Sequence, residues 1–408
     1  MKINALIAAL VLACSTANAT DLEVTHWWTS GGEAVAVKKL SEAFTSKTPH
    51  KWVDGAIAGS GNTATPIIMS RILGGDPMGA TQLKHGRDAE ELIKAGLLLD
   101  LTDIAEEQGW KKVINPPQIL DTCTINGRIY CAPLNIHSAQ WIWLSRKAFD
   151  DAGVKVPTNW DEFVAAAPAL EKAGKVPLAM GQQSWQSTLA FNAMSLAIAG
   201  VDVWKAVNLE KKADVARGSE YKKVFEAAAA ARSLSKNSKV QDWNQATNMV
   251  INDQAGGQIM GDWAQGEFQI AGKVAGKDYD CLPGLGVHEV LDTGGDGIYF
   301  PVNKNPDITA AQKDLARLLL TPEVQVSFNL AKGSLPVRGD VDLASANECM
   351  KKGLAILAKG GAITSSNLSF TPDTIGQIED LIVEFWADPN YSAADAQKAY
   401  AAIIEKAD

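Results

Sequence analysis

The chain has 408 residues, of which 46% are hydrophobic and 21% are charged, and its net charge is −9 at pH 7. This acidic balance argues against nucleic acid and anionic membrane surfaces as partners, because both repel a negatively charged protein. The length exceeds the ~250–300 residues at which a single hydrophobic core stops growing, so we expect two domains.

The first 19 residues predict an export signal. Lys2 supplies a positive charge, residues 5–13 form a short apolar run, and Ala17-Asn18-Ala19 fits a small-residue cleavage site. The run is shorter than the ~20 apolar residues that a membrane-spanning helix needs. We expect cleavage after Ala19, which leaves an exported mature chain that begins at Thr20. The alternative is a lipoprotein anchor signal that ends at Cys14 and places the lipid there.

Four cysteines remain after the leader. They are Cys123, Cys131, Cys281 and Cys349, and an even number in an exported chain predicts disulfides. Asn126-Gly127 lies between β-prone residues in the segment between Cys123 and Cys131. This is a strong hairpin signal, and the hairpin brings the sulfurs of these two cysteines face to face. That pairing leaves Cys281 with Cys349, and the alternative is four reduced, buried thiols. No His stands at ligand spacing from a cysteine, so we expect no metal site.

Strand-like and helix-like stretches alternate along the first part of the mature chain. The expected elements are strands at 22–27, 52–57 and 80–83 and helices at 34–44, 66–73 and 88–95. This alternation predicts an α/β layer on a mainly parallel sheet, which the hairpin at 121–133 interrupts.

The alternation restarts at Gln140. The expected elements are strands at 141–144 and 258–260, helices at 160–173, 187–199, 220–234 and 243–252, and a largely helical tail over 311–408. No low-complexity linker separates the two parts, so we expect the chain to cross between two lobes more than once. We assign residues 20–134 plus about 290–335 to an N-terminal lobe. Residues 135–289 plus about 336–408 form a C-terminal lobe.

Aromatic side chains stand beside polar ones at the predicted strand ends. Trp27 and Trp28 close the first strand, Trp263 follows a later one, and Trp243 opens a helix. Ligands of open α/β sheets bind at strand ends. A sugar offers C–H faces to tryptophan rings and hydroxyl groups to carboxylates, amides and ammonium groups. The pattern therefore indicates a sugar site, and the alternative for each tryptophan is a place in the core.

Catalytic motifs are missing from the sequence. It contains no Gly-x-Ser-x-Gly elbow, no Gly-x-x-x-x-Gly-Lys-Ser/Thr phosphate loop and no His-Glu-x-x-His zinc motif. We therefore expect a binding protein and not an enzyme. A glycosidase needs only two carboxylates across the scissile bond, so an exported carbohydrate-active enzyme is the alternative.

The chain contains six short motifs in a characteristic order. They are Leu22-Glu23-Val24 running into Trp27-Trp28, Leu73-Gly74-Gly75-Asp76-Pro77, Pro133-Leu134-Asn135-Ile136-His137, Pro157-Thr158-Asn159-Trp160-Asp161-Glu162-Phe163, Gly261-Asp262-Trp263-Ala264 and Ala331-Lys332-Gly333-Ser334. In this order and spacing the chain resembles the periplasmic solute-binding proteins of ABC sugar importers, in particular the subgroup that binds glucose and related aldohexoses. The resemblance covers residues 21–408.

The resemblance implies a two-lobed periplasmic-binding-protein fold of the type II kind, in which each lobe is an α/β sandwich and the lobes close over a monosaccharide. It implies a periplasmic location, the membrane subunits of an ABC importer as partners, and no cofactor; we expect a monomer. By matching positions, the sugar contacts would be Trp27 or Trp28, Glu33, Gln82, Lys84, Asn135, His137, Trp243, Trp263, Asp296 and Lys332. One extra residue between Trp28 and Glu33 weakens the match at Glu33.

The chain departs from the resemblance near its C-terminus. Many glucose-binding members of that group carry a His in the segment matching Ser365–Phe370, where it donates to a sugar hydroxyl. This chain has no His there, and Asn367 or Ser369 would have to take that role. We therefore expect a shifted or broadened preference, toward mannose, galactose or a larger sugar. Capture of a disaccharide or polyol, or a role as a chemosensory adaptor, are further alternatives.

Overall fold

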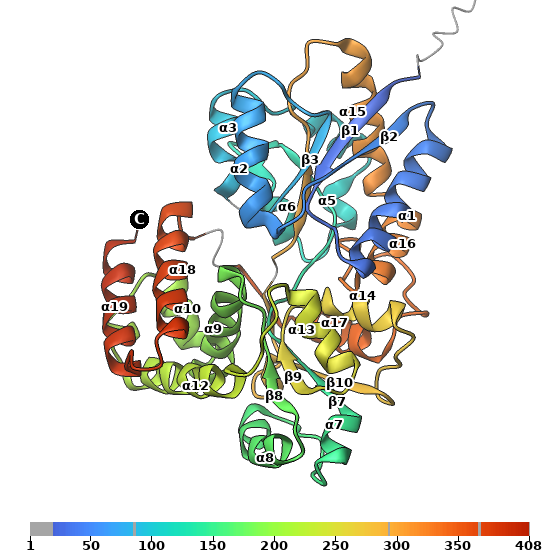
Figure 1. The fold of residues 1–408 in the computed structure, drawn as a ribbon. Helices are drawn as coiled ribbons and strands as arrows, with labels where there is room; N and C mark the ends of the chain where they lie inside the picture. The colour runs from blue at the N-terminus through green and yellow to red at the C-terminus, as the bar shows by residue number, and fades with distance from the viewer. Residues whose placement is uncertain (1–18, 85–86, 293, 366–368, 408) are drawn as a thin grey trace, which may run out of the picture.

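The computed structural model describes residues 19–84, 87–292, 294–365 and 369–407, so Asn367 and all but the last residue of the expected signal peptide lie outside the described residues. Two lobes, each built around its own sheet, lie one above the other (Figure 1). The first lobe, at the top, holds the N-terminal strands, and the second lobe lies below it. The expectation of a two-lobed α/β fold is therefore confirmed.

The first lobe is built on a five-stranded sheet in the order β2-β1-β3-β12-β6. Its strands are β1 (Asp21–His26), β2 (Lys51–Ala56), β3 (Ala80–Lys84), β6 (Cys131–Pro133) and β12 (Asp296–Tyr299). Its helices are α1 (Gly31–Lys47), α2 (Ser60–Leu73), α3 (Glu90–Lys94), α4 (Thr102–Glu107), α5 (Trp110–Val113), α6 (Gln118–Asp121), α15 (Pro306–Leu319) and α16 (Pro322–Lys332). A 3-10 turn, η1 (Arg87–Ala89), precedes α3.

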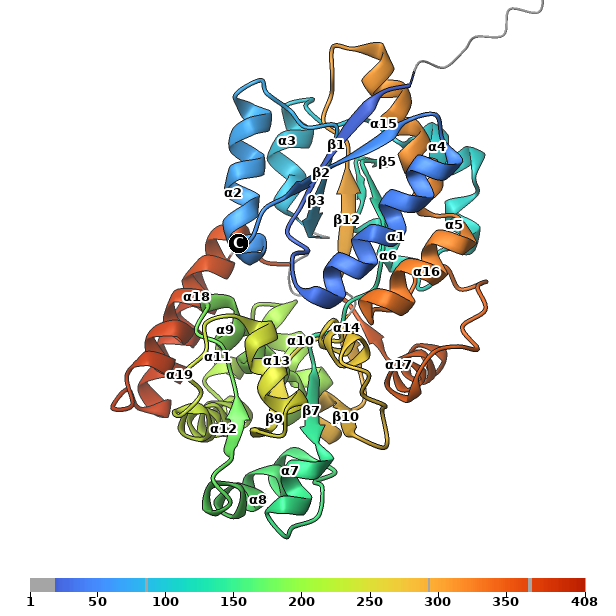
Figure 2. The same cartoon turned by 45° about the vertical axis from the view of Figure 1, so that its right-hand side comes forward.

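The second lobe is built on a four-stranded sheet in the order β10-β7-β9-β8. Its strands are β7 (Trp141–Ser145), β8 (Val176–Ala179), β9 (Ala255–Ile259) and β10 (Tyr279–Pro283). Its helices are α7 (Arg146–Asp151), α8 (Trp160–Lys172), α9 (Ser184–Ala199), α10 (Val201–Asn208), α11 (Ala213–Ala216), α12 (Ser219–Ser235), α13 (Trp243–Ile251), α14 (Ala264–Ile270), α17 (Glu348–Ala358), α18 (Pro372–Ala387) and α19 (Ala393–Lys406), with the 3-10 turn η2 (Gly284–Gly286). The C-terminal helices α18 and α19 lie beside α9 and α12 (Figures 1 and 2).

The chain crosses between the two sheets through three described segments. They run from β6 to β7, from β10 to β12 and from α16 to α17. Single bridges join Ile136 to Leu335 and His137 to Gly294, so the three crossings lie side by side. The lobe boundaries that the sequence predicts stay a prediction.

Local sequence explains how the first lobe presents its loop after β1. Leu22 and Val24 alternate into the core of the sheet, and α1 then begins at a capping box in which Ser30 accepts from the amide of Glu33. Leu40 and Phe44 follow at helical spacing and are buried, so one face of α1 packs on the sheet. The loop between strand and helix is thereby held at the end of the sheet that faces the second lobe (Figure 2).

The prediction of a mainly parallel sheet is confirmed for the three N-terminal strands, since β1 pairs in parallel with both β2 and β3, but it fails at the strands that follow a crossing. In the first sheet β12 runs antiparallel to both β3 and β6, and in the second sheet β7 runs antiparallel to both β9 and β10. Both β12 and β7 are the strands that the chain enters after a crossing. They are not preceded by a helix of the same lobe, so the parallel strand-helix-strand geometry does not apply to them.

Both predicted disulfides are present, Cys123–Cys131 and Cys281–Cys349. The first closes the hairpin of β4 (Thr124–Ile125) and β5 (Arg128–Ile129). Within that turn Asn126 and Gly127 both have positive φ, as the Asn-Gly signal predicts. The second ties β10 to α17.

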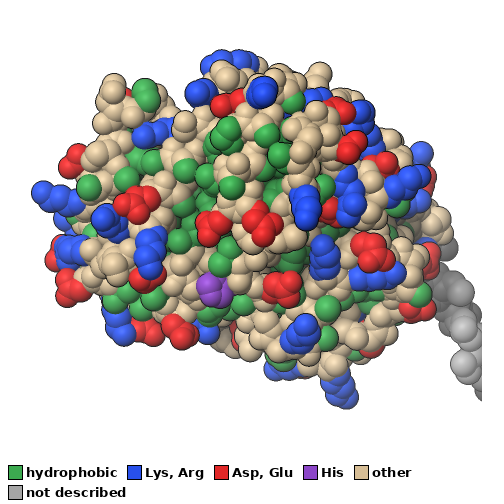
Figure 3. Space-filling model, turned by 90° about the horizontal axis from the view of Figure 1, so that it is seen from below, with side chains coloured by type: hydrophobic (Ala, Val, Ile, Leu, Met, Phe, Trp, Pro, Cys, Tyr) green, Lys and Arg blue, Asp and Glu red, His purple; other side chains and the backbone are tan. Residues whose placement is uncertain are grey.

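Two further observations concern the described residues alone. None of their helices is long and apolar enough to cross a membrane. The face of the second lobe that points away from the first carries acidic and basic side chains interspersed with one another, which is the usual arrangement of a solvated surface (Figure 3).

Candidate functional site

Asp296 stands at the centre of a buried polar network at the end of the first sheet. Gln82 on β3 donates its amide to Asp296 Oδ1 at 2.8 Å, and Asn135 donates to Asp296 Oδ2 at 3.1 Å. The Asp296 amide in turn donates to Asn135 Oδ1 at 2.8 Å. Gln82 also accepts from the amide of Trp27 at 3.0 Å, which fixes the loop after β1. The sheet order that places β3 beside β12 therefore brings together residues that the sequence separates widely.

His137 connects this network to the second lobe. Its Nε2 lies 3.1 Å from Asp296 Oδ2, and its Nδ1 lies 2.5 Å from Asp262 Oδ1. Asp262 follows β9, and its second oxygen accepts from the Ser138 amide at 3.0 Å. One imidazole on the first crossing is thus held between a carboxylate from each lobe.

The charges around His137 and Asp296 support each other. Burial acts to lower the pKa of His137, but the charge and hydrogen bonds of Asp262 and Asp296 outweigh it, and the pKa lies above its usual range in spite of nearby Lys332. Burial acts to raise the pKa of Asp296, yet hydrogen bonding and charge from His137, with Lys332 and Gln82, hold it well below its usual range. Both shifts favour the charged forms, an imidazolium for His137 and a carboxylate for Asp296.

Glu33 and Lys332 form a buried ion pair beside this network. Lys332 Nζ donates to Glu33 Oε1 at 2.9 Å, and Glu33 Oε2 accepts from the Ser30 amide at 3.3 Å. The same ammonium lies 5.9 Å from the ring centroid of Trp263, within the range of a cation–π contact. Glu33 thus caps α1 and holds Lys332 next to Trp263, and its expected contact with a sugar stays a prediction.

Trp27 and Lys84 lie together over the first turn of α2. A Cβ built on Gly61 would lie 3.3 Å from Trp27 Cζ2 and 3.4 Å from Lys84 Cε. Trp27 is half-buried, and Lys84 is exposed at the end of β3, opposite Asp296 in the strand register. A bare glycine at position 61 thus leaves room for an aromatic ring and a cation at the edge of the network.

Trp28 is corrected from a candidate contact to a core residue. Only 2% of it is exposed, and its ring lies 5.5 Å from that of Phe328 and stacks on His26 at 5.6 Å. Successive residues of an extended segment point to opposite sides, so Trp27 and Trp28 cannot both face the site. The sequence left this choice open; the structure places Trp28 in the core, and contact of Trp27 with a ligand stays a prediction.

The second lobe contributes a pair of tryptophans. Trp263 packs its ring edge-to-face on His137, with centroids 5.0 Å apart. Trp185, at the start of α9, lies 6.3 Å from Trp263 and is half-buried. Its Nε1 donates to Gln183 at 3.1 Å, and Gln183 donates to Asp242 at 3.0 Å.

Trp243 is the first residue of α13 and is 9% exposed. Its carbonyl oxygen accepts from the Thr247 hydroxyl and the Gln258 amide. These are backbone contacts that fix the start of the helix, and a sugar contact by its ring stays a prediction.

Sequence reasoning missed Asp262 and Trp185 as candidate contacts. Asp262 is part of the Gly261-Asp262-Trp263 motif and directly precedes Trp263, which the sequence predicts as a sugar contact. Its position at a strand end could therefore have indicated Asp262 as well. Trp185 follows the polar run Gln182-Gln183-Ser184 after β8, which is the same kind of strand end as the other candidates.

The segment that precedes Asn367 lies near the crossing that carries His137. β13 (Ala362–Ile363) pairs with β11 (Leu291–Asp292), and the chain from β11 leads to Gly294, whose carbonyl accepts from the His137 amide. Burial raises the pKa of Asp292 to about 6, against hydrogen bonds from Ser365 and the Gly294 backbone. The described neighbours of Asn367 are therefore close to the network.

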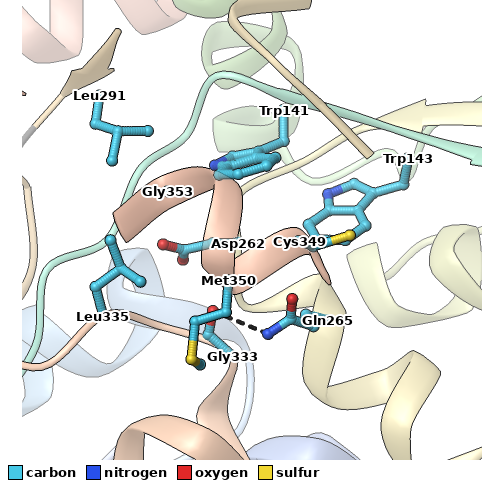
Figure 4. A pocket seen from close by; sticks show the side chains of 10 residues that line it. All are labelled: Trp141, Trp143, Asp262, Gln265, Leu291, Gly333, Leu335, Cys349, Met350 and Gly353. Carbon is cyan, nitrogen blue, oxygen red and sulfur yellow. Dashed lines mark hydrogen bonds between the residues drawn. The ribbon is translucent and has the colours of Figure 1, made fainter. Parts of the chain in front are cut away.

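A small cavity lies beside Asp262, between the second lobe and the crossing segments that carry Leu291, Gly333 and Leu335 (Figure 4). It is lined by Trp141, Trp143, Asp262, Gln265, Leu291, Gly333, Leu335, Cys349, Met350 and Gly353. Its volume of about 10 Å³ is near the minimum for one water molecule, so it cannot accept a sugar. The buried Trp141 Nε1 on this wall has no hydrogen-bond partner among the described residues, which fits a site for structural water.

Two sheets in separate lobes, three adjoining crossings and polar residues meeting between the lobes define a two-lobed solute-binding fold. The chain belongs to the family of bacterial extracellular solute-binding proteins, whose model matches residues 30–326.

Known proteins are similar along most of the chain. A probable sugar-binding periplasmic protein of Rhizobium meliloti (strain 1021) is 37% identical over 357 residues, which is 86% of this chain and 85% of that protein. Among solved structures, the bacterial solute receptor AcbH, described with an exclusive preference for b-D-galactopyranose, has a TM-score of 0.76 at 20% identity and covers 94% of this chain and 98% of its own. Maltose-bound MalE3 of T. maritima has a TM-score of 0.74 at 17% identity, with 95% of this chain and 100% of its own covered. At these identities the two structures support the fold alone.

Proposed function

We propose that this protein is the periplasmic substrate-binding component of an ABC-type sugar importer, and that it binds one monosaccharide, an aldohexose, between its two lobes. The observation that carries the proposal is the set of polar groups that converge on His137 from both lobes, between tryptophans of either lobe. A pyranose matches this chemistry, since its hydroxyl groups need paired donors and acceptors and its C–H faces need aromatic planes. The relative from Rhizobium meliloti, named as sugar-binding, supports the same ligand class.

The proposed sugar contacts are Trp27, Gln82, Lys84, Asn135, His137, Asp262, Trp263, Asp296 and Lys332, with Glu33, Trp243 and Asn367 retained from the sequence. Gln82, Lys84 and Asp296 belong to the first lobe, whereas Asp262 and Trp263 belong to the second. A ligand that touches both lobes binds the closed state better than the open one, and this difference in affinity drives closure. Export by the signal peptide, cleavage after Ala19 and a monomeric state complete the proposal.

The test is a thermal-shift and calorimetric screen of the purified mature protein against glucose, galactose, mannose, xylose, maltose and a polyol such as sorbitol. We expect stabilisation by at least one aldohexose, recovery of that sugar unchanged, and a smaller radius of gyration with it. Consumption of the sugar would identify an enzyme instead. An increase in melting temperature with maltose or sorbitol alone would show that the ligand is a disaccharide or a polyol and not a monosaccharide. No increase with any of these compounds would contradict a sugar as the ligand.

A further inference from the structure

The two lobes touch on both sides of the proposed site. On one side the Gly32 amide of α1 donates to Glu267 of α14 at 2.8 Å, and a Cβ on Gly32 would lie 2.6 Å from the backbone carbon of Gly266. We call this the α1 contact. On the other side Asn62 of α2 donates to Glu379 of α18 at 2.8 Å and lies 3.5 Å from the Ser184 hydroxyl of α9. We call this the α2 contact. Figure 1 shows the helices of the two contacts at opposite edges of the molecule, with α1 and α14 to the right and α2 and α18 to the left.

The two contacts differ in how easily they part. The α1 contact combines a close backbone approach of Gly32 to Gly266 with the Glu267 carboxylate, which is buried at the positive end of a 17-residue helix. The α2 contact consists of two side-chain hydrogen bonds at the surface, and Asn62 itself is exposed. Surface hydrogen bonds are readily exchanged for water, so the α2 contact is the one that parts at lower cost.

A tryptophan is close to each half of the α2 contact, in space for Trp27 and along the chain for Trp185. Gly61, which precedes Asn62 in the chain, lies against the Trp27 ring. Trp185 directly follows Ser184 in the chain. The Trp185 ring lies 6.3 Å from the Trp263 ring, and the Trp185 indole N–H donates to Gln183. The position of Trp185 is therefore set from within the second lobe. The aromatic groups nearest the α2 contact therefore come from both lobes.

We propose that Trp185 contacts the sugar, and that Trp185 together with the Asn62 bridge limits the site to one sugar ring. This inference rests on the proposed function. One pyranose lies behind the bridge and lets it form, whereas a second linked ring projects through the α2 side and keeps Asn62 away from Glu379 and Ser184. A longer sugar thus forfeits contacts of the closed state that a monosaccharide retains, and selectivity follows from that difference.

The experiment measures affinities by calorimetry for glucose, galactose and mannose against maltose, cellobiose and lactose. The wild type is compared with Trp185→Ala, Asn62→Ala and Glu379→Ala, and Gln377→Ala is the matched control. Gln377 is exposed on the same helix as Glu379 and donates to Asp373 within that helix. A thermal melt of each variant confirms folding.

We expect the wild type to prefer a monosaccharide by at least tenfold. Each of the three variants should move the ratio of disaccharide to monosaccharide affinity at least tenfold toward the disaccharide, and Gln377→Ala should keep the wild-type ratio. For Trp185→Ala the monosaccharide affinity itself should also fall, and Trp185→Phe should recover most of it. Ratios within twofold of wild type in all three variants, or a wild type that binds disaccharides as well as monosaccharides, would overturn the inference. A wild type that binds no sugar would instead overturn the proposed function on which it rests.

Discussion

Glu33 and Lys332 are 299 residues apart in the chain, yet their side chains form an ion pair at 2.9 Å in which the ammonium is 2% exposed and the carboxylate 10%. The pair joins the first turn of α1 to the last turn of α16. A second pair, Lys47–Glu323, joins the other ends of the same two helices but is largely exposed. The two ion pairs connect the same two helices but differ in burial, so a comparison between them isolates the effect of burial.

We predict that Glu33→Gln lowers the free energy of unfolding by about 3–5 kcal/mol, because it leaves the Lys332 ammonium buried without its partner charge. Gln preserves the capping box, so the loss reports on the ion pair. Glu323→Gln in the exposed pair should cost less than about 1 kcal/mol. Urea unfolding of both variants checks this, and equal losses would show that burial does not distinguish the pairs.

His137 makes stability depend on pH. Its pKa is raised in the folded protein, so its contribution is fully present below the unfolded value of about 6.5 and is lost as the pH rises through the folded value. Asp296 has a lowered pKa, so its contribution is present above about 3.9 and is lost as the pH falls further. Between these limits both contributions are present, and above them the urea midpoint should decrease.

The matched variant for this prediction is Asp262→Asn. It removes one of the two carboxylates that raise the pKa of His137, so the alkaline decrease in the urea midpoint should begin at lower pH than in wild type. NMR titration of the His137 ring measures the same pKa directly. A His137 that titrates below 6.5 in the wild type would contradict the imidazolium between two carboxylates.

Trp27 and Trp28 should respond in opposite ways to substitution. Trp27→Ala should weaken binding of the cognate sugar by roughly 1–3 kcal/mol, as other flat ligands lose on removal of a stacking ring, with a small change in melting temperature. Trp28→Ala removes a buried ring packed on Phe328 and should lower the free energy of unfolding by about 3–5 kcal/mol. Calorimetry and thermal melts on both variants test the pair, and a reversed pattern would exchange their roles.

The two disulfides should differ in their contribution to stability. Their cysteines are 8 and 68 residues apart, and loop entropy gives about 2.5 kcal/mol for the shorter loop and about 4.4 kcal/mol for the longer one. Replacement of Cys281 and Cys349 by Ala should therefore lower the urea midpoint more than replacement of Cys123 and Cys131. Four free thiols in the unreduced protein by mass spectrometry would rule out both bridges.

Asn367 is the residue with which we test sugar identity. Many members of the glucose-binding group that the sequence resembles carry a His in the matching segment, and a hydroxyl left unpaired in a closed site costs about 1–3 kcal/mol. Asn367→His should then raise the affinity for glucose relative to the best ligand of the wild type. If the wild type already prefers glucose strongly and the variant is unchanged, the segment does not touch the sugar.

Much of the candidate site was open to prediction because its signals are local. A polar or aromatic residue at a strand end needs only the alternation of the strand to be recognised, and this selected Trp27, Gln82 and Trp263. The Asn-Gly turn likewise determined the Cys123–Cys131 pair, and with it the other disulfide, since only two cysteines remained. The two-lobed α/β organisation follows from chain length and from the repeated strand–helix pattern.

Tertiary structure decided the properties that depend on residues far apart in the chain. Periodicity does not encode strand direction, so the antiparallel β7 and β12 appeared only in the assembled sheets. The choice between Trp27 and Trp28 required a second surface, the face of α16 that carries Phe328. His137 acquired its two carboxylates only because the sheet order and the crossing bring Asp296 and Asp262 to either side of one ring. Contacts of this kind depend on the path of the backbone through space, which local sequence patterns do not specify.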